Sequence, residues 1–232
     1  MKIAVIPARG GSKRIPRKNI KSFCGKPMIA WSIVAARRSG CFERIIVSTD
    51  DNEVAEVARS EGAEVPFRRP PALADDLATT GAVMKHAVEW CASHGPSPDP
   101  VCCIYATAPF VRPADIRAGL ELLVDRRSDY VFTVTQYPAP IQRALRITAS
   151  GHVEMFQPEF FAARSQDLEP AYHDAAQFYW GRFDAWRAER PIFSPAAIAL
   201  KLPRDRVQDI DTPEDWARVE LLSRIMQTGP LK

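Results

Sequence analysis

Short apolar runs alternate with segments of helical periodicity along most of this chain, and this alternation restricts its fold more than any other feature. Strands are predicted at the apolar runs 3–6, 44–49, 101–106 and 130–136. Helices are predicted at the amphipathic segments 28–38, 51–62, 80–93 and 113–127. Strands joined through helices of this length favour right-handed crossovers and parallel pairing. We therefore expect an α/β fold with a doubly wound, mostly parallel sheet.

The segment from about 137 to 180 interrupts this pattern. From 137 to 169 it is rich in prolines, aromatic residues and mixed charge, and the core pattern resumes near Tyr179. We interpret it as an excursion from a single domain spanning 1–232, because no linker divides the chain into separable units. Its aromatic residues are denser than a monomer surface tolerates, which favours a subunit contact. They are Phe156, Phe160, Phe161, Phe178 and Trp180.

The last predicted elements are a strand at 200–210 and a helix that begins at Pro213. Thr212 suits the N-cap position, and Asp215 lies in the first turn. Proline is favoured at the first helical position because its missing N–H leaves no donor unsatisfied. The sequence therefore defines the start of this helix well.

Composition places the chain among ordinary globular proteins, with 46% apolar and 25% charged residues. The longest uncharged stretches, 100–111 and 131–142, fall short of the roughly 20 apolar residues that cross a bilayer. We expect no membrane partner, no secretory leader and a cytoplasmic location. The net charge of only +3 argues against a nucleic-acid partner. The five cysteines lack metal-ligand spacing and are expected to be reduced, mostly buried thiols.

Positive charge is concentrated at the start of the chain. Residues 1–42 contain no aspartate or glutamate. The same stretch contains ten cationic residues, which are Lys2, Arg9, Lys13, Arg14, Arg17, Lys18, Lys21, Lys26, Arg37 and Arg38. Such a stretch is expected to face an anionic ligand. A nucleic-acid arm is the weaker interpretation, because these cations are interspersed with apolar residues that must pack.

The loop after the first strand, which reads PARGGSKR, is the first candidate site. In an open α/β sheet, ligands bind at the carboxyl ends of the strands. Gly10 and Gly11 allow a close backbone approach and can direct N–H groups toward an anion. Arg9, Lys13 and Lys18 add positive charge to residues 9–18, which we call the basic loop. The loop suits a polyphosphate, with a solvated turn as the alternative, and it matches neither the Walker nor the dinucleotide-binding glycine pattern.

A second candidate site, the acidic pair Asp209 and Asp211, lies near the other end of the sequence. At extended geometry both carboxylates point to one side while Ile210 faces the core. Two hard oxygen ligands suit magnesium, which completes its shell with water and substrate phosphates. Two solvated acids before a helix are the alternative. A nucleoside triphosphate with its metal needs both groups, so we expect the basic loop and the acidic pair to meet across one cleft.

Six segments carry a further signal. They read IAVIPARGGSKRIPRKN, RIIVSTDD, RRPPALADDLATT, DIDTPED, YPAPIQRAL and HDAAQFYWG. The first four together resemble the cytidylyltransferases that activate nine-carbon acidic sugars, the sialic acid group. The last two resemble more specifically the branch that makes CMP-pseudaminic acid. The resemblance implies a Rossmann-like nucleotide-diphospho-sugar transferase fold, CTP and an acidic nine-carbon sugar as substrates, magnesium as cofactor, and a homodimer.

The resemblance also implies roles for individual residues. The triphosphate and cytidine would be held by Arg9, Gly10, Gly11, Ser12, Lys13, Lys18 and Asn19, with Arg69 and Thr79 or Thr80 at the base and ribose. Magnesium would bind Asp209 and Asp211, and the catalytic residues would be Arg9, Lys13, Lys18 and Asp211. In relatives the segment that matches 137–180 forms much of the dimer contact. The candidate sugar contacts there are Gln142, Arg143, Asp174, Gln177 and Tyr179.

The implied reaction converts CTP and a nonulosonic acid into a CMP-sugar and pyrophosphate. The anomeric hydroxyl would attack the α-phosphate in line, and its proton could pass to Asp211, to a metal-bound hydroxide or to the substrate itself. Where sialic acid enzymes read Gln-Pro-Thr-Ser-Pro, residues 105–109 read Tyr-Ala-Thr-Ala-Pro, which favours a different nonulosonate such as pseudaminic acid. Ala176 stands where a glycine is expected in the pseudaminic branch.

Two other functions stay open at this point. The chain could transfer another nucleotide, as enzymes of the CMP-Kdo or molybdopterin type do. It could also be a non-catalytic regulator that binds a nucleotide on the same fold. A regulator of this kind would bind CTP without releasing pyrophosphate.

Overall fold

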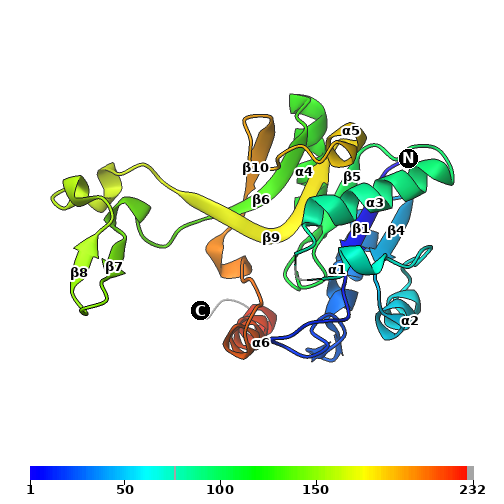
Figure 1. Ribbon diagram of the computed structural model, residues 1–232, viewed down its shortest axis with the longest axis horizontal. Coiled ribbons are helices and arrows are strands. Elements are labelled where there is room, and N and C mark those ends of the chain that lie inside the picture. Colours follow the sequence, from blue (N-terminus) through cyan, green and yellow to red (C-terminus); the bar gives the residue numbers. More distant parts are fainter. Residues whose placement is uncertain (76, 229–232) are drawn as a thin grey trace.

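A six-stranded sheet forms the centre of the computed structural model, which describes residues 1–75 and 77–228, the side chains of 227 and 228 excepted (Figure 1). The strand order is β10-β6-β9-β5-β1-β4. The strands span β1 (Ile3–Pro7), β4 (Arg44–Ser48), β5 (Val101–Ile104), β6 (Tyr130–Gln136), β9 (Tyr172–Gly181) and β10 (Ala197–Lys201). Five of them are parallel to one another, and β9 runs antiparallel to β5 and β6. The predicted α/β class with a mostly parallel sheet is confirmed.

Helices cover both faces of this sheet. They span α1 (Met28–Ser39), α2 (Asn52–Ser60), α3 (Thr80–Ser93), α4 (Pro113–Arg126), α5 (Phe183–Arg187) and α6 (Pro213–Thr228). Helices α1, α2 and α4 pack on one face, and α3 and α5 pack on the other. Along β1, Ala4 and Ile6 belong to the first core while Ile3 and Val5 belong to the second. Burial on both faces explains why the strands are continuous apolar runs in the sequence.

Polar side chains fix where the helices near the cleft begin. Asp51 caps α2, and its Oδ1 accepts the Val54 N–H at 2.9 Å. Thr79 caps α3, and its Oγ1 accepts the Ala82 N–H at 3.1 Å. The N–H group of Ala82 is therefore satisfied before any ligand binds. The Thr79 hydroxyl accepts this bond and keeps its own O–H for another partner.

The segment 137–171, which we call the arm, projects from the rest of the molecule (Figure 1). It carries a small antiparallel hairpin of β7 (Leu145–Ile147) and β8 (Val153–Met155). Its short 3-10 helices are η2 (Ile141–Arg143), η3 (Pro158–Phe160) and η4 (Ser165–Asp167). The excursion that the sequence predicts over 137–180 is thus shorter in the structure, because β9 brings the chain back into the central sheet from Tyr172 onward.

Two of the aromatic residues predicted at a subunit contact lie in the core instead. Phe178 and Trp180 are fully buried in β9, and the Trp180 indole N–H donates to Ile116 O at 2.9 Å. The prediction is wrong for these two residues because β9 is covered on both faces, which the sequence pattern did not reveal. Phe156 and Phe161 lie on the arm and are exposed.

The chain after β10 also differs from the prediction. The strand expected over 200–210 ends at Lys201, and the 3-10 helix η5 (Arg204–Arg206) follows it. Arg206 turns inward, where its guanidinium lies 2.5 Å from the Asp115 carboxylate. Ile210 is buried, as predicted, although residues 208–211 are irregular rather than a strand. An extended strand is excluded here because η5 redirects the chain toward the start of α6.

The start of α6 at Pro213 agrees with the prediction. The Thr212 hydroxyl accepts the Asp215 N–H at 3.2 Å, and the Asp215 carboxylate accepts the Thr212 N–H at 2.8 Å. This reciprocal pair satisfies donors that the first turn of a helix leaves without a partner. It also fixes the chain just after the acidic pair.

The cysteines are unpaired, and all except Cys24 are buried, as predicted. Burial raises the pKa of the Cys103 thiol well above its usual range, which makes it a poor nucleophile at neutral pH. None of the helices in the described part of the chain combines the length and apolar character that a membrane span requires.

Candidate active site

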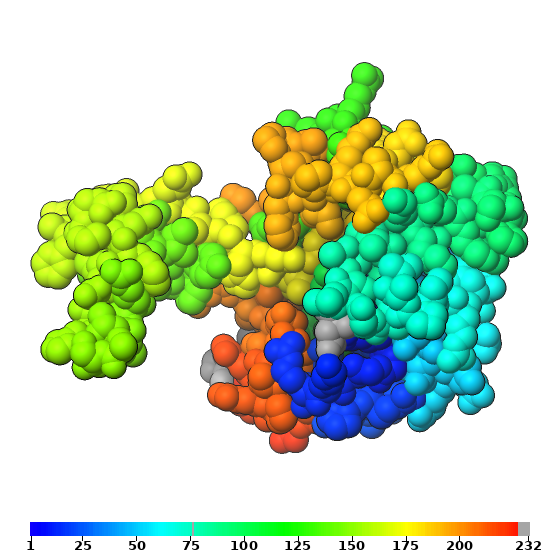
Figure 2. All heavy atoms as spheres, in the orientation of Figure 1, coloured from blue at the N-terminus to red at the C-terminus, as the bar shows by residue number. Residues whose placement is uncertain are grey.

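A cleft of about 520 Å³ opens at the carboxyl ends of β1 and β5. This volume is in the range of small-molecule sites. In the space-filling view, the N-terminal segment in blue lies beside the segment before α6 in orange and below the teal part of the chain that includes α3 (Figure 2). The cleft is lined by Pro7, Arg9, Ser12, Lys13, Arg14, Lys18, Asn19, Arg69, Ala78, Thr80, Val83, Tyr105, Ala106, Thr107 and Asp211.

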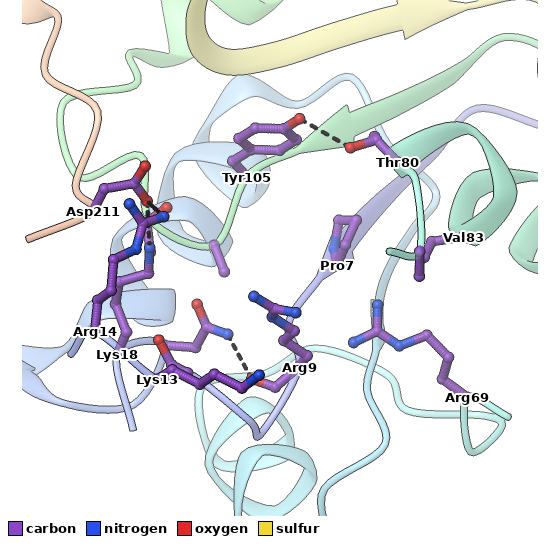
Figure 3. A pocket seen from close by; sticks show the side chains of 15 residues that line it. Pro7, Arg9, Lys13, Arg14, Lys18, Arg69, Thr80, Val83, Tyr105 and Asp211 are labelled. Carbon is purple, nitrogen blue, oxygen red and sulfur yellow. Dashed lines mark hydrogen bonds and ion pairs between the residues drawn. The ribbon is translucent and has the colours of Figure 1, made fainter. Parts of the chain in front are cut away.

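The lining is strongly cationic, with five lysine and arginine side chains against the one carboxylate of Asp211. The charged ends of Arg9, Lys13 and Arg69 face a common space in the close-up (Figure 3). Burial lowers the pKa of Arg69, and the positive charge of the nearby Arg9 lowers it further to a smaller extent. Like charges held together in a cleft favour an anionic ligand that lies between them.

The basic loop meets Asp211 of the acidic pair at this cleft, as predicted, whereas Asp209 is not among the lining residues. Arg14 Nη2 lies 3.0 Å from Asp211 Oδ1. Lys18 Nζ donates to Ile210 O at 2.5 Å and lies 3.4 Å from Asp211 Oδ1. These contacts join residues more than 190 positions apart in the sequence. The cleft therefore has a cationic wall and an acidic edge.

Arg69 is the most deeply buried cation of the cleft, with only 4% of its surface exposed. Its backbone N–H donates to Thr49 O at 2.9 Å, which anchors it beside the end of β4. Its guanidinium lies 3.4 Å from Asp50 Oδ1, and its Nε has no hydrogen-bond partner among the described residues. Burial lowers the pKa of Arg69. A buried guanidinium with an unused donor is suited to a ligand that supplies an acceptor oxygen.

Thr80 and Tyr105 line another side of the cleft (Figure 3). Their hydroxyl groups are 3.0 Å apart and hydrogen-bonded. The Tyr105 ring packs against Tyr179 with 5.2 Å between centroids, and the Tyr179 hydroxyl donates to Asp174. Of the two adjacent threonines left open by the sequence, Thr80 lines the cleft and Thr79 caps α3.

Gly10 and Gly11 do not line the cleft. The Gly10 N–H, expected to face an anion, donates instead to Asp50 Oδ1 at 3.1 Å. A Cβ at Gly10 would lie 2.5 Å from Asp51 Oδ2, whereas one at Gly11 would meet nothing within 4 Å. The Gly10 N–H is therefore already satisfied within the protein, and Gly10 allows the close approach of Asp51.

The acidic pair has the chemistry of a magnesium site. Desolvation by the surrounding protein raises the pKa of Asp209, and the negative charge of Asp211 raises it further. Asp209 Oδ1 accepts the Ile210 N–H at 2.9 Å, and Asp211 faces the cleft. Within the described residues, no three acidic, histidine or cysteine side chains are grouped to hold a metal. The pair fits magnesium, which commonly binds one or two carboxylates together with water and substrate phosphates.

None of the five candidate sugar contacts, all within the described residues, lines the cleft. Gln142 and Arg143 lie on the arm, where Gln142 Nε2 donates to Glu169 O at 3.0 Å. Gln177 is buried, and its Nε2 donates to Arg206 O at 2.7 Å. Asp174 accepts the Ala176 N–H at 2.9 Å and the Tyr179 hydroxyl. Within one chain these groups have internal partners or lie away from the cleft.

Sequence reasoning placed Pro7 and Arg14 in the candidate loop without assigning them a contact, and it missed Tyr105, Thr107, Ala78, Val83 and Ala106 as lining residues. One signal could have found the two larger ones. Tyr105 and Thr107 directly follow β5, whose carboxyl end is where a ligand is expected. Ala78 and Val83 carry no sequence signal, since small apolar residues are common throughout the chain.

Comparisons with known proteins add independent information. Residues 3–159 match a protein family described as cytidylyltransferase. A pseudaminic acid cytidylyltransferase of Campylobacter jejuni is 44% identical over 223 residues, which cover 96% of both chains. A CMP-N,N'-diacetyllegionaminic acid synthase of Legionella pneumophila is 34% identical and covers 97% of both chains. These similarities extend through both the cleft and the arm.

Solved structures share the fold. The structure of CMP:2-keto-3-deoxy-manno-octonic acid synthetase complexed with CTP has a TM-score of 0.71 with 18% identity, covering 97% of this chain and 99% of that one. A 4-diphosphocytidyl-2C-methyl-D-erythritol synthase from Anaerococcus prevotii has a TM-score of 0.63 with 12% identity, covering 96% and 98%. At such low identity these likenesses concern the fold alone.

Proposed function

The chain belongs to the cytidylyltransferase family, and from this premise we propose that it transfers CMP from CTP to the anomeric hydroxyl of a nonulosonic acid and releases pyrophosphate. The observation that carries the proposal is the meeting of the basic loop with Asp211 in one cleft. A triphosphate needs several fixed cations, and its metal needs carboxylates beside them. We place the reaction in the cytoplasm, where CTP is made and used.

In the proposed reaction, the anomeric oxygen attacks the α-phosphorus while the bond to the bridging oxygen of the β-phosphate breaks. The protein contributes by positioning the two substrates and by stabilising charge on the departing pyrophosphate. Arg9, Lys13 and Lys18 are the cations that we assign to this task, because all three line the cleft. Removal of one such preorganised charge typically costs about 10²-fold to 10³-fold in rate.

Asp209 and Asp211 are the residues that would hold magnesium. When bound, the ion neutralises phosphate charge and lowers the pKa of an attacking hydroxyl. Arg14 and Lys18 keep the Asp211 carboxylate at the edge of the cleft, near where phosphates would lie. Asp211 remains one candidate acceptor for the hydroxyl proton.

Arg69 is assigned to the nucleotide base or ribose. Its burial, its unused Nε and its place on the cleft wall opposite Asp211 support this role. Thr80 is assigned to the same part of CTP, since its hydroxyl is held at the cleft by Tyr105. Both residues lie away from the basic loop in the sequence and reach the cleft through separate elements.

Pseudaminic acid is the sugar that we favour. Similarity to an enzyme of that name along nearly the whole chain supports this preference. Tyr105 adds to it, because a bulky, hydrogen-bonded aromatic ring stands where sialic acid enzymes carry the flexible amide of glutamine. Such a replacement changes both the volume and the hydrogen-bonding pattern that a sugar would meet.

We further propose that the protein acts as a homodimer in which the arm contacts a second copy. Large apolar side chains are exposed along the arm, among them Leu145, Ile147, Val153, Phe156 and Phe161. A row of such residues is costly to leave in water and is typical of subunit interfaces. An arm seated against a second copy would also bring Gln142 and Arg143 toward another chain.

The test is mass spectrometry of the products formed when the purified chain, CTP and magnesium are mixed with a panel of nonulosonic acids. We expect CMP-pseudaminic acid to accumulate faster than the other CMP-sugars, with equimolar pyrophosphate. Parallel reactions with GTP and UTP serve as nucleotide controls. Strong turnover with GTP or UTP and none with CTP would contradict the proposal.

A doubly substituted Asp209→Asn and Asp211→Asn variant separates catalysis from simple binding. We expect it to lose product formation while retaining the fold. CTP binding by the unsubstituted chain without pyrophosphate release from any sugar acid would favour a non-catalytic regulator instead.

A further inference from the structure

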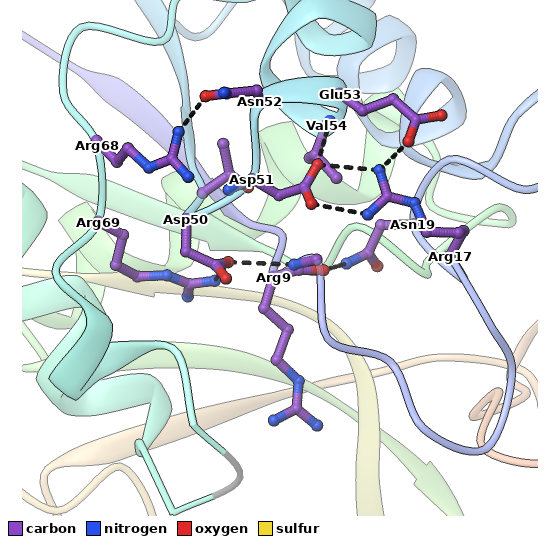
Figure 4. Close-up of polar contacts among 12 residues, drawn as sticks. Arg9, Arg17, Asn19, Asp50, Asp51, Asn52, Glu53, Val54, Arg68 and Arg69 are labelled. Atoms are coloured by element: carbon purple, nitrogen blue, oxygen red, sulfur yellow. Dashed lines mark hydrogen bonds and ion pairs between the residues drawn. The ribbon is translucent and has the colours of Figure 1, made fainter.

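Two consecutive carboxylates, Asp50 and Asp51, follow β4 and face the back of the basic loop (Figure 4). Neither lines the cleft, and the mechanism above assigns neither a role. They nevertheless bring negative charge to the back of a loop that has no acidic residue of its own. We call Asp50 and Asp51 the acidic clamp.

Asp50 connects the basic loop to Arg69 on the wall of the cleft. Its Oδ1 accepts the Gly10 N–H at 3.1 Å and lies 3.4 Å from the Arg69 guanidinium. One carboxylate thus contacts the residue after Arg9 and the most deeply buried cation of the cleft. Asp50 thus holds the backbone beside Arg9 and the guanidinium of Arg69, while the Arg9 guanidinium itself donates to Asp75 O at 3.0 Å.

The peptide group between Arg9 and Gly10 is held on both of its polar sides. Its N–H donates to Asp50, and its carbonyl oxygen accepts the Asn19 side-chain amide at 2.9 Å. A peptide fixed in this way has little freedom to rotate. The direction in which the Arg9 side chain leaves the backbone is therefore set by Asp50 and Asn19 together.

Asp51 holds the other end of the loop. Both of its carboxylate oxygens accept hydrogen bonds from the Arg17 guanidinium, at 2.7 and 2.9 Å, and Arg17 also contacts Glu53. The Arg17 hydrogen bonds lower the pKa of Asp51 to about 2, so Asp51 is ionised at neutral pH. Arg17 has a positive φ of 55°, a left-handed backbone that is unfavourable for a residue other than glycine.

The clamp also explains the need for glycine at position 10. Asp51 approaches so closely that a Cβ on residue 10 would lie 2.5 Å from its Oδ2. The two clamp residues therefore contact the loop at Gly10 and at Arg17, on either side of Lys13 and Arg14. A loop this rich in like charges would otherwise spread apart through self-repulsion.

We propose that Asp50 and Asp51 are positioning residues that hold the basic loop in the shape required to bind the triphosphate of CTP. The proposal rests on the proposed function, because it takes CTP as the ligand of the loop. Asp50 holds the Arg9–Gly10 peptide and contacts Arg69, and Asp51 holds Arg17 in its left-handed turn. The cleft is thereby preorganised before the nucleotide arrives.

The test uses substitutions that remove the clamp and leave the rest of the fold intact. Asp51→Asn keeps a side-chain oxygen for the N-cap of α2 and loses the charge that pairs with Arg17. Asp50→Ala removes both Asp50 contacts, whereas Asp50→Asn retains an acceptor for the Gly10 N–H. The matched control is Glu64→Gln, because Glu64 forms a similar two-oxygen ion pair with Arg44 at the opposite end of β4.

The measurements are the Kd of CTP by calorimetry in the presence of magnesium, the KM of the sugar acid, and thermal stability. We expect Asp51→Asn to weaken CTP binding about 10-fold and Asp50→Ala about 30-fold, since misplaced binding groups cost up to about 10²-fold. Asp50→Asn should recover most of the loss. Glu64→Gln should bind CTP as the unsubstituted chain does, and the KM of the sugar acid should stay within about twofold in every variant.

The outcomes separate the two proposals. If Asp51→Asn and Asp50→Ala lose thermal stability as Glu64→Gln does but bind CTP normally, the clamp is only structural and the inference is wrong. If the sugar KM rises as much as the CTP Kd, the effect is general and the inference is equally wrong. If the unsubstituted chain does not bind CTP, the proposed function fails, and the inference fails with it.

Discussion

The cleft and the arm are built on opposite principles. In the cleft, charged groups are held by other groups of the same chain, as Asp211 is held by Arg14 and Lys18, and Arg69 is 4% exposed. On the arm, large apolar groups face solvent, with Ile147 78% and Phe161 76% exposed. The cleft thus holds charged groups through contacts within one chain, whereas the arm exposes large apolar groups, a property typical of interaction surfaces.

This difference suggests that the cleft and the arm serve different substrates. The residues assigned to the nucleotide lie together in the cleft, whereas none of the five candidate sugar contacts lines it. A single chain thus accounts for recognition of CTP better than for recognition of the sugar. If the arm contacts a second copy, CTP binding requires only the folded chain, whereas sugar binding also requires the dimer.

The largest effect on activity is expected from Lys13→Ala, a change confined to the cleft. Loss of a cation that faces the phosphates should reduce kcat by about 10²-fold to 10³-fold. Initial rates of pyrophosphate release measure the effect. Lys85→Ala is the matched control, because Lys85 pairs with Glu189 on the surface of α3 away from the cleft. A Lys13→Ala enzyme with unchanged kcat would remove the basic loop from the mechanism.

The second prediction concerns the arm. Ile147→Ser combined with Phe161→Ser should dissociate the proposed dimer, since a side chain buried at its interface would contribute about 1.5 to 3 kcal/mol. Sedimentation measures the oligomeric state, and steady-state kinetics measure the two KM values. We expect the KM of the sugar to rise about 10-fold or more while CTP binding is unchanged. An unsubstituted chain that is monomeric at every concentration would contradict the role given to the arm.

The third prediction compares two adjacent glycines. Gly10→Ala should destabilise the fold by about 1 to 3 kcal/mol, because the added methyl group overlaps Asp51. Gly11→Ala is the matched control, since its methyl group would meet nothing within 4 Å. Urea unfolding measures both. Equal stability of the two variants would show that Asp51 can move away from the loop without cost.

The smallest effect is expected from the protonation of Asp51 at acidic pH, which lowers the stability of the fold. The pKa of Asp51 is lowered to about 2 in the folded protein, mainly by the Arg17 hydrogen bonds, so this carboxylate stabilises the fold above its unfolded pKa of about 4. That contribution is lost as the pH falls from about 4 to about 2. It amounts to about 1 kcal/mol after allowance for the solvent exposure of Arg17.

Urea unfolding at pH 7 and at pH 3 checks this prediction. The stability lost between the two pH values should be smaller in Asp51→Asn than in the unsubstituted chain. Equal losses in both proteins would show that the Arg17 pair contributes no pH dependence.

Much of the fold could be predicted because its signals are local. Helix α3 begins at Thr80 and ends at Ser93, as the spacing of its apolar residues indicates, and the start of α6 follows from Thr212 and Pro213. The antiparallel course of β9 could not be read in this way. Its pairing with β5 and β6 is made between distant residues, and its burial on both faces erases the alternation that marks a half-exposed strand.

In the candidate site, too, the sequence predicts local properties and misses long-range contacts. The sequence identified Arg9, Lys13 and Asp211 as chemically suited to a nucleotide and its metal, because residue types and loop position are local properties. It assigned Gly10 to the anion, whereas the structure gives the Gly10 N–H to Asp50. Which donor meets which acceptor is decided by long-range approach, and no local pattern encodes it.

The sequence alone determined the α/β class, the cationic loop at the end of the first strand, the acidic pair, and the resemblance to sugar-activating cytidylyltransferases, a family whose membership the comparisons confirm. Only the tertiary structure decided that Asp50 and Asp51 hold the loop from behind, that Tyr179 and Gln177 are buried beside the cleft rather than lining it, and that the arm leaves its apolar side chains in solvent. The physical reason is that periodicity and residue chemistry act over a few neighbouring positions, whereas charge pairing and burial depend on which distant segments the sheet brings together.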